Sequence, residues 1–321
     1  MARLTFGIFL WLWSATMLAQ GTFRVVTWNV ENLFDCRHDS LRDDYEFMPD
    51  SPRQWTWGRY WRKIEDISRV VMGIGGTTAP MLVGLCEVEN DSVMTTLCRR
   101  GPLRTIGYRY VMSDSPDRRG IDVALMYRPT LFRLMGYDTR RIPSQAHGLR
   151  PTRDLLHVWG QTIGGDTLHI VVCHLPSRAG GHKDSKRNRR LAVGELMQLT
   201  DSLLRRQPAC QLLVMGDFNA TLRDKALAPL LKGTPLVPLT PAKRRVSSGT
   251  YRFQGEWSWI DHMLVSPALA QKVAGGIQLY AASWMRRASS DGTWYPRRTY
   301  LGANYSGGVS DHVPAYVDFR F

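Results

Sequence analysis

The sequence lacks the features that would divide the chain, span a membrane repeatedly or cross-link it. Its 321 residues contain no internal repeat, no low-complexity tract and no linker, so a single domain over residues 21–321 is expected. No second long apolar run follows residues 4–18, which excludes a protein with several membrane spans. The five cysteines match no zinc-binding spacing, and an odd number cannot all pair within one chain. We therefore expect no disulfide framework and at most one bridge.

Acidic residues are scarce relative to basic ones. The chain has 28 Asp and Glu against 42 Lys and Arg, a formal net charge of +14. This balance makes a polyanionic partner or an anionic surface plausible. However, the arginines are scattered in small clusters, and a solvated surface explains them equally well. A hydrophobic content of 44% with 22% charged residues is typical of a globular protein and excludes disordered and fibrous classes.

The N-terminal segment has the pattern of a targeting signal. Arg3 precedes the apolar residues 4–18, and the small residues Ala15, Ala19 and Gly21 lie at the end of that run. Fifteen apolar residues are few for a membrane span. The pattern predicts a secretory signal peptide over residues 1–20 and export to the periplasm or the medium, without stable membrane insertion after processing. A retained N-terminal membrane anchor is the alternative.

After this segment, strand-like and helix-like patterns alternate to the end of the chain, which predicts a layered α/β fold. Helical periodicity is found at residues 59–74, 91–100 and 185–206. Apolar, strand-like runs are found at residues 23–28, 80–86, 108–112, 121–127, 131–137, 155–163, 167–173, 212–215, 257–265 and 313–319.

The run 212–215 reads as a strand buried on both faces, and polar residues follow it directly. Asp217 and Asn219 lie two positions apart, so in extended backbone both side chains would project to the same side. A carboxylate there could orient or deprotonate water, and an amide could donate to a phosphate oxygen. The alternative is an ordinary turn, because Asp, Asn and Gly favour turns.

Other strand-like runs also end in polar residues, and strand ends on one edge of a layered fold converge on a common cleft. Asp261 lies inside an apolar run, where a carboxylate is costly unless it is paired, and a histidine is the natural partner. The remaining residues of this kind are Asn29, Glu87, His174, Asp217, Asn219, Asp311 and His312.

These residues belong to six short motifs that occur in a fixed order: Trp28–Glu31, Leu85–Asn90, His174–Pro176, Gly216–Asn219, Trp259–His262 and Ser310–His312. Together they resemble the endonuclease/exonuclease/phosphatase superfamily with its DNase I-like fold, over residues 22 to 321, as an exported bacterial-type member. The resemblance implies a four-layer α/β sandwich, with two mixed sheets packed face to face and helices on both outer sides. It also implies phosphoester hydrolysis with a divalent cation, usually Mg²⁺, with Mn²⁺ or Ca²⁺ as alternatives.

The resemblance also implies roles for individual residues. Metal ligands are expected at Glu87, Asn29, Glu31 and Asp311. Catalytic roles are expected for His174, Asp217, Asn219, Asp261 and His312, where Asp261 orients His312, and either His312 or Asp217 activates the water. Arg178 and Asn219 are the candidates for contacting the substrate phosphate. Glu89 and His262 are expected to point away from the site because side chains alternate along a strand.

The sequence favours nucleic acid as the substrate of a monomeric enzyme. Basic residues in two loops could neutralise backbone phosphates, and aromatic residues could stack bases. They are Arg118, Arg119, Lys243, Arg244 and Arg245, with Trp55, Trp57, Trp257 and Tyr251. A phosphatase of small metabolites or inositol phosphates, a sphingomyelinase-like phospholipid phosphodiesterase, and a non-catalytic binding protein on the same fold are the alternatives.

Overall fold

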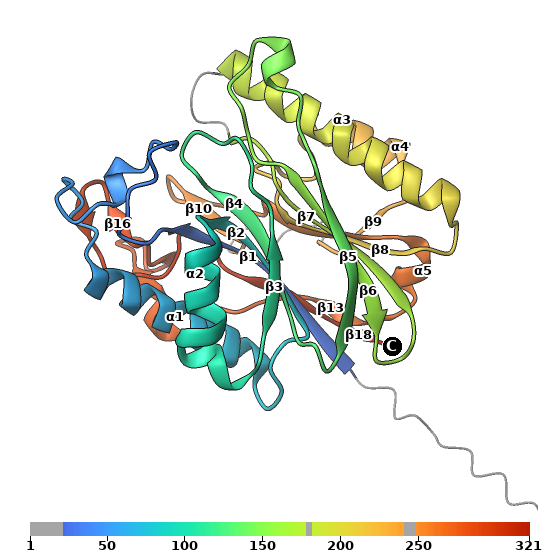
Figure 1. Ribbon diagram of the computed structural model, residues 1–321, viewed down its shortest axis with the longest axis horizontal. Coiled ribbons are helices and arrows are strands. Elements are labelled where there is room, and N and C mark those ends of the chain that lie inside the picture. The colour runs from blue at the N-terminus through green and yellow to red at the C-terminus, as the bar shows by residue number, and fades with distance from the viewer. Residues whose placement is uncertain (1–21, 178–181, 241–247) are drawn as a thin grey trace, which may run out of the picture.

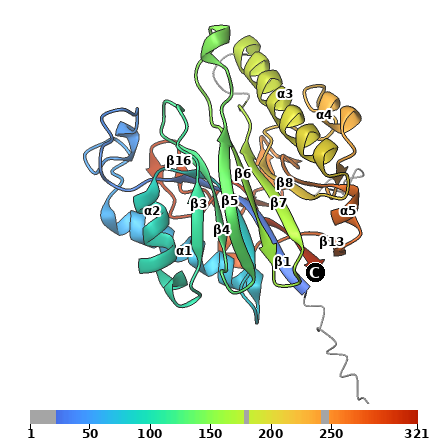
Figure 2. The same ribbon diagram turned by 45° about the vertical axis from the view of Figure 1, so that its right-hand side comes forward.

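Two six-stranded mixed sheets pack face to face, and helices cover the outer face of each (Figures 1 and 2). The computed structural model describes residues 22–177, 182–240 and 248–321. The first sheet has the order β13 (Val273–Leu279), β18 (Ala315–Arg320), β1 (Thr22–Leu33), β2 (Leu82–Val88), β4 (Asp122–Tyr127) and β3 (Arg109–Met112). The second has the order β5 (Phe132–Arg140), β6 (Leu155–Thr162), β7 (Thr167–His174), β8 (Gln211–Asp217), β12 (Asp261–Val265) and β9 (Val237–Pro238). The four-layer α/β sandwich expected from the sequence is confirmed.

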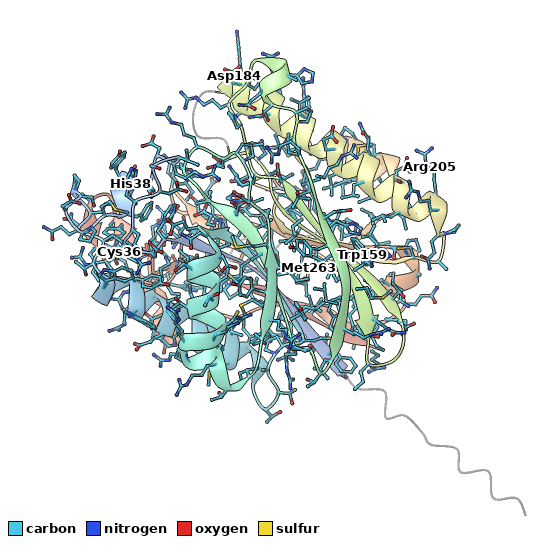
Figure 3. The ribbon with its side chains drawn as sticks, viewed as in Figure 1. Cys36, His38, Trp159, Asp184, Arg205 and Met263 are labelled. Atoms are coloured by element: carbon cyan, nitrogen blue, oxygen red, sulfur yellow. The ribbon has the colours of Figure 1, made fainter. Side chains whose placement is uncertain are left out.

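Side-chain alternation explains the layers. In β8, Leu213 and Met215 pack in the core between the sheets, whereas Leu212 and Val214 pack toward the helices on the outer face. Both sets are buried, so the strand reads as a continuous apolar run rather than an alternating one. Met263 of β12, labelled in Figure 3, also belongs to the core between the sheets.

Helices α1 (Trp57–Gly75) and α2 (Asp91–Thr95) cover the first sheet, and α3 (His182–Arg206) and α4 (Ala228–Gly233) cover the second (Figure 1). The Thr56 hydroxyl caps α1 by accepting from the Arg59 amide, and Gly76 ends the helix with a φ of 62°. The helix predicted at residues 91–100 consists of α2 and a π-helical turn, Thr96–Arg100, that continues it. A short helix α5 (Pro267–Ala270) follows β12.

Three two-stranded hairpins lie outside the two large sheets. Their strands are β10 (Tyr251–Phe253) with β11 (Glu256–Ser258), β14 (Arg286–Ala288) with β15 (Trp294–Pro296), and β16 (Tyr300–Leu301) with β17 (Asn304–Tyr305). Short 3-10 turns complete the regular structure at Tyr45–Phe47, Pro102–Thr105, Gln145–His147 and Ser283–Met285.

Two sequence predictions about strands are wrong in detail. The strand predicted at residues 257–265 is two strands, because Trp257 pairs within the β10–β11 hairpin while β12 starts at Asp261 and pairs with β8. The apolar character of residues 259 and 260 hid this break. Strand β1 also runs beyond residue 28 to Leu33, although Glu31 and Asn32 have φ values of 53° and 54° that interrupt its pleat.

All five cysteines are free and buried. Within the described ranges, no helix is long and apolar enough to cross a bilayer. The predicted signal peptide, residues 1–20, lies outside the described residues.

Gly216 is the tightest backbone position next to the strand ends. It has a φ of 142°, and a Cβ atom placed there would lie 1.8 Å from the Cys173 carbonyl oxygen of β7. Strands β7 and β8 are parallel and pair Cys173 with Gly216 and His174 with Asp217. Only glycine therefore allows β7 and β8 to stay paired up to the polar residues at their ends.

We predict that Gly216→Ala lowers the free energy of unfolding by about 3 kcal/mol, because both the backbone conformation and the contact with Cys173 become strained. Gly194→Ala is the matched control, since Gly194 lies within α3 with no atom within 4 Å of its added Cβ. That change should raise stability by up to about 1 kcal/mol. Urea denaturation measures both, and equal stability of the two variants would contradict the role of Gly216.

Candidate active site

The polar strand ends converge on one carboxylate oxygen, Oδ2 of Asp217 at the end of β8. The Asn29 amide nitrogen donates to it at 3.0 Å. Nε2 of His174 lies 3.5 Å from the same oxygen, and Nε2 of His312 lies 3.8 Å from it. The other oxygen of Asp217 accepts the backbone N–H of Asn219 at 2.8 Å. Residues from four separate motifs of the sequence, that of Asp217 included, therefore meet around one carboxylate.

Asp217 is 1% exposed, and these neighbours fix the position of its carboxylate. Burial, together with the nearby Asp261 carboxylate, raises the pKa of Asp217 to about 7, while His312 and the two hydrogen bonds oppose the rise. A buried carboxylate with a pKa near neutrality is suited to accept a proton from water.

His312 is oriented by a second buried carboxylate. Its Nδ1 donates to Asp261 Oδ2 at 2.8 Å, which leaves Nε2 facing Asp217. Burial acts to lower the pKa of His312, but the carboxylates of Asp261, Asp217 and Asp311 outweigh it and raise the pKa well above its ordinary value. The partner of Asp261 expected from the sequence is therefore His312, and the imidazole is a cation at neutral pH.

His174 has the opposite electrostatic character. Burial, then the positive charges of Arg153, Arg119 and His312, lower its pKa well below the ordinary value, so the ring is neutral. Its Nε2 lies between Asp217 and Glu87, 3.8 Å from Oε1 of Glu87. Two histidines near one carboxylate thus carry different charges.

A second acidic group lies beside the first. Burial lowers the pKa of the Lys63 ammonium below its ordinary value. The nearby carboxylates of Glu31, Asp311 and Glu87 oppose this shift without reversing it. Burial and the charge of Asp311 raise the pKa of Glu31 to about 7. Arg298 forms an ion pair with Asp311 and lies 4.0 Å from Glu31. Several carboxylates are therefore crowded into a partly buried volume.

This acidic group fits a hard divalent cation. Mg²⁺ prefers carboxylate and amide oxygens. Burial is the main cause of the raised pKa of Glu31, and the repulsion from Asp311 that adds to it is of the kind that a bound cation relieves. In the described part of the chain, the one group of three acidic or histidine side chains with ligand atoms within 4.8 Å of one another is Asp217, Asp261 and His312. Because His312 is a cation held by Asp261, that group suits proton transfer, and the Glu31 side of the site suits the metal.

The local backbone is unusual at several of these residues. Glu31, Glu87 and Asn219 have φ values of 53°, 65° and 48°, a left-handed conformation that non-glycine residues seldom adopt. The extended backbone expected for residues 217–219 is wrong, because Asp217 ends β8 and Asn219 turns away. The turn at Asn219 is itself part of the site, because the Asn219 backbone N–H binds Asp217. Strained residues of this kind cluster at functional sites.

The structure adds detail for other predicted residues. The Asn219 side-chain amide donates to the Leu175 carbonyl at 2.9 Å, and its second hydrogen is the one suited to contact an anion. Glu89 accepts from the Asp35 amide, and His262 contacts Thr240 and Ala220, so both side chains point away from Asp217 as expected. Arg178, Lys243, Arg244 and Arg245 lie outside the described residues.

The aromatic residues considered for base stacking lie in different places. Trp55 is fully buried and donates from its ring N–H to the Phe34 carbonyl, so it belongs to the core. Trp257 is also buried, whereas Trp57 is exposed. The Tyr251 ring centroid lies 4.9 Å from that of His312, which places Tyr251 against the site.

Sequence reasoning missed three basic residues. Arg153 donates to the Leu175 carbonyl at 3.0 Å and pairs with Asp117 at 3.2 Å, both through buried groups. Lys63 donates to the Glu31 carbonyl and, at 2.6 Å, to the Thr299 hydroxyl. The spacing of Lys63 from Ile67 placed it on the buried face of α1, and that signal was available. No pattern in the sequence marked Arg153 or Arg298.

Comparison with known proteins identifies the family. A model described as the Endonuclease/Exonuclease/phosphatase family matches residues 24–320. The chain belongs to the endonuclease/exonuclease/phosphatase family. It is accordingly a phosphoester hydrolase of a family whose members depend on divalent metals. A search of the curated proteins finds no match.

Solved structures with the same fold cover almost the whole chain. TDP2 from Caenorhabditis elegans has a TM-score of 0.60 at 15% identity, over 94% of this chain and 75% of that one. The mannosyl-6-phosphatase Bt3783 from Bacteroides thetaiotaomicron has a TM-score of 0.57 at 16% identity, over 93% and 100%. D. rerio TDP2 complexed with a single-strand DNA product has a TM-score of 0.54 at 14% identity, over 94% and 99%. At these identities the likeness shows the DNase I-like fold of the family.

We predict that Asp217→Asn and His312→Ala each lower kcat at least about a hundredfold, because each removes a positioned proton-transfer or charged group. His147→Ala, at an exposed histidine in a 3-10 turn, is the control and should keep wild-type turnover. Thermal unfolding checks that the variants fold. Wild-type kcat in a folded Asp217→Asn or His312→Ala variant would contradict the assignment.

Proposed function

We propose that this enzyme is a phosphodiesterase that cleaves nucleic acid by metal-assisted attack of water on phosphate. One observation carries the proposal: the Nε2 atoms of His174 and His312 lie 3.5 Å and 3.8 Å from Asp217 Oδ2. This arrangement brings a proton acceptor and a cation for the phosphate into the same small volume.

Asp217 is the residue that aligns and deprotonates the attacking water. The Asn29 amide and the Asn219 backbone N–H each bind one of its oxygens, so the carboxylate is fixed in one orientation. His312 is better suited to bind the phosphate than to accept a proton, because three carboxylates surround it and its ring already carries both protons. Of the two water-activating groups left open by the sequence, Asp217 is therefore the one we propose.

His174 takes the other position around the phosphate. Because the ring is neutral, one of its nitrogens carries a proton and the other does not. Its Nε2 faces Asp217 and Glu87, and Nδ1 is buried with no hydrogen-bond partner in the described ranges. A proton on Nε2 is placed to bind a phosphoryl oxygen, and Asn219 can donate from its second amide hydrogen.

Glu87, Asn29, Glu31 and Asp311 are the residues that would hold a divalent cation, with Mg²⁺ as the proposed ion. When bound, such a cation polarises the phosphoryl oxygen and stabilises charge on the leaving group. Arg298 and Lys63 supply positive charge to the same carboxylates in this structure. Their positive charge offsets the repulsion among these carboxylates before the substrate binds.

The proposal of a nucleic-acid substrate is supported by charge around the site. The chain carries a net charge of +14. Arg119 lies close enough to lower the pKa of His174, and Arg298 pairs with Asp311. Basic side chains flanking a cleft are suited to the repeated phosphates of a nucleic acid. The likeness to a mannosyl-6-phosphatase makes a phosphomonoester the competing substrate.

We also propose that the enzyme acts as a monomer in a single domain, residues 21–321, after export. The N-terminal pattern of Arg3 followed by apolar residues 4–18 and small residues supports a cleaved signal peptide.

The test is hydrolysis of plasmid DNA, sphingomyelin vesicles, a bis-aryl phosphodiester and an aryl phosphomonoester, each with Mg²⁺ and with EDTA. We expect Mg²⁺-dependent nicking of the plasmid and slower turnover of the bis-aryl ester. Glu87→Gln should shift the Mg²⁺ titration to at least about tenfold higher concentration, because the site loses one charged ligand.

Turnover of the monoester or of sphingomyelin without nicking would contradict the nucleic-acid proposal. An unchanged Mg²⁺ titration in Glu87→Gln would rule Glu87 out as a principal ligand. Glu256→Gln, at an exposed acidic residue of β11, is the matched control and should leave the titration unchanged.

A further inference from the structure

A groove of about 490 Å³ opens directly beside the acidic side of the site. Residues of β10 and of the β14–β15 hairpin line it, together with Arg298 and Asp311 of the site. This volume is in the range of a small-molecule or nucleotide site. None of the catalytic steps proposed above uses its lining residues Phe253, Arg287 and Tyr295.

One wall of the groove carries an aromatic row that leads to the catalytic histidine. Phe253 is 57% exposed, and its ring lies nearly parallel to that of Tyr251, with an interplanar angle of 11° and centroids 6.4 Å apart. Tyr251 in turn lies against His312. Single exposed apolar residues are common on protein surfaces. Phe253 differs because its ring continues a row that ends at a reacting group.

The same groove carries positive charge. Arg287 is exposed on β14, where its backbone pairs with that of Tyr295, and no hydrogen bond or ion pair of its side chain is found within the described ranges. Arg298 also lines the groove, where it pairs with Asp311. An anionic group in the groove would therefore meet the guanidinium of Arg287 and, next to the site, the paired one of Arg298.

Arg252 fixes the two walls relative to each other. Its guanidinium donates to the Trp294 carbonyl at 2.8 Å and to Asp291 at 2.7 Å, and it lies 4.0 Å from the centroid of the Tyr295 ring. Residues 291–295 belong to the β14–β15 hairpin, so one buried side chain of β10 joins both hairpins. The groove is held in its shape without a ligand, which lowers the entropy cost of binding.

We propose that this groove binds an unpaired nucleotide next to the scissile phosphate, with its base on Phe253 and its phosphate at Arg287. The inference rests on the proposed nucleic-acid substrate and makes it more specific. A base can stack on an exposed ring only when it is not already stacked in a duplex. The enzyme therefore prefers single-stranded nucleic acid, or the frayed end of a duplex, over an intact double helix.

The test compares a single-stranded oligonucleotide of about 12 nucleotides, its duplex and the bis-aryl ester as substrates. We expect kcat/KM on the single strand to exceed that on the duplex at least tenfold. Phe253→Ala should lower the ratio of single-strand to bis-aryl kcat/KM about tenfold, because one stacking contact is lost. Arg287→Ala should reduce the slope of log Kd against log salt by about 0.7, the value for one phosphate contact on a single strand.

Matched controls are Tyr137→Ala, an exposed aromatic residue on β5, and Arg206→Ala, an exposed arginine at the end of α3; both should behave as the wild type. Equal cleavage of single strand and duplex would overturn the groove assignment without contradicting the proposed nuclease activity. The same holds if Phe253→Ala and Tyr137→Ala give the same ratio of single-strand to bis-aryl kcat/KM.

Fluorescence anisotropy of the single strand in EDTA separates the two proposals. Binding that Phe253→Ala weakens about tenfold supports the groove even if hydrolysis of nucleic acid is absent, in which case the proposed function alone fails. Absence of binding to wild type in EDTA and in Ca²⁺ would overturn the groove.

Discussion

The whole site depends on keeping one carboxylate, Asp217, charged while it is buried. A buried carboxylate is stable only if hydrogen bonds and opposite charge replace water. Here the Asn29 amide, the Asn219 backbone N–H and the cationic ring of His312 take that role. His312 is a cation because Asp261 holds its other nitrogen. The charge states of Asp217 and His312 are therefore linked.

The fold provides this arrangement by ending strands from both sheets at one place. Strand β1 of the first sheet carries Asn29, while β7, β8 and β12 of the second carry His174, Asp217 and Asp261. The close approach of β7 and β8, which Gly216 permits, sets the distance between His174 and Asp217. A site divided between two sheets has a fixed geometry because the apolar core between them is close-packed.

Much of the fold and most of the site could be predicted from the sequence, because buried strands that end in polar residues are visible as patterns. The pairing of Asp261 with a histidine followed from the cost of an isolated buried charge. Arg153 and Arg298 could not be assigned in this way, because they reach the site through long side chains from elements whose placement the sequence does not specify. The helical spacing of Lys63 marked it as buried, but it did not show which carboxylates this lysine meets. The sequence offered the turn at Asn219 only as the alternative, because an extended continuation of β8 explained the same spacing.

The most direct test of this account is a double-mutant cycle between Asp217 and His312, measured as kcat with saturating Mg²⁺ on the best substrate. If the two residues act as one unit, the Asp217→Asn, His312→Ala double variant should be no more than about tenfold slower than the slower single variant. Multiplication of the two single effects in the double variant would show that the residues act independently, and would contradict the central role given to the charge state of Asp217.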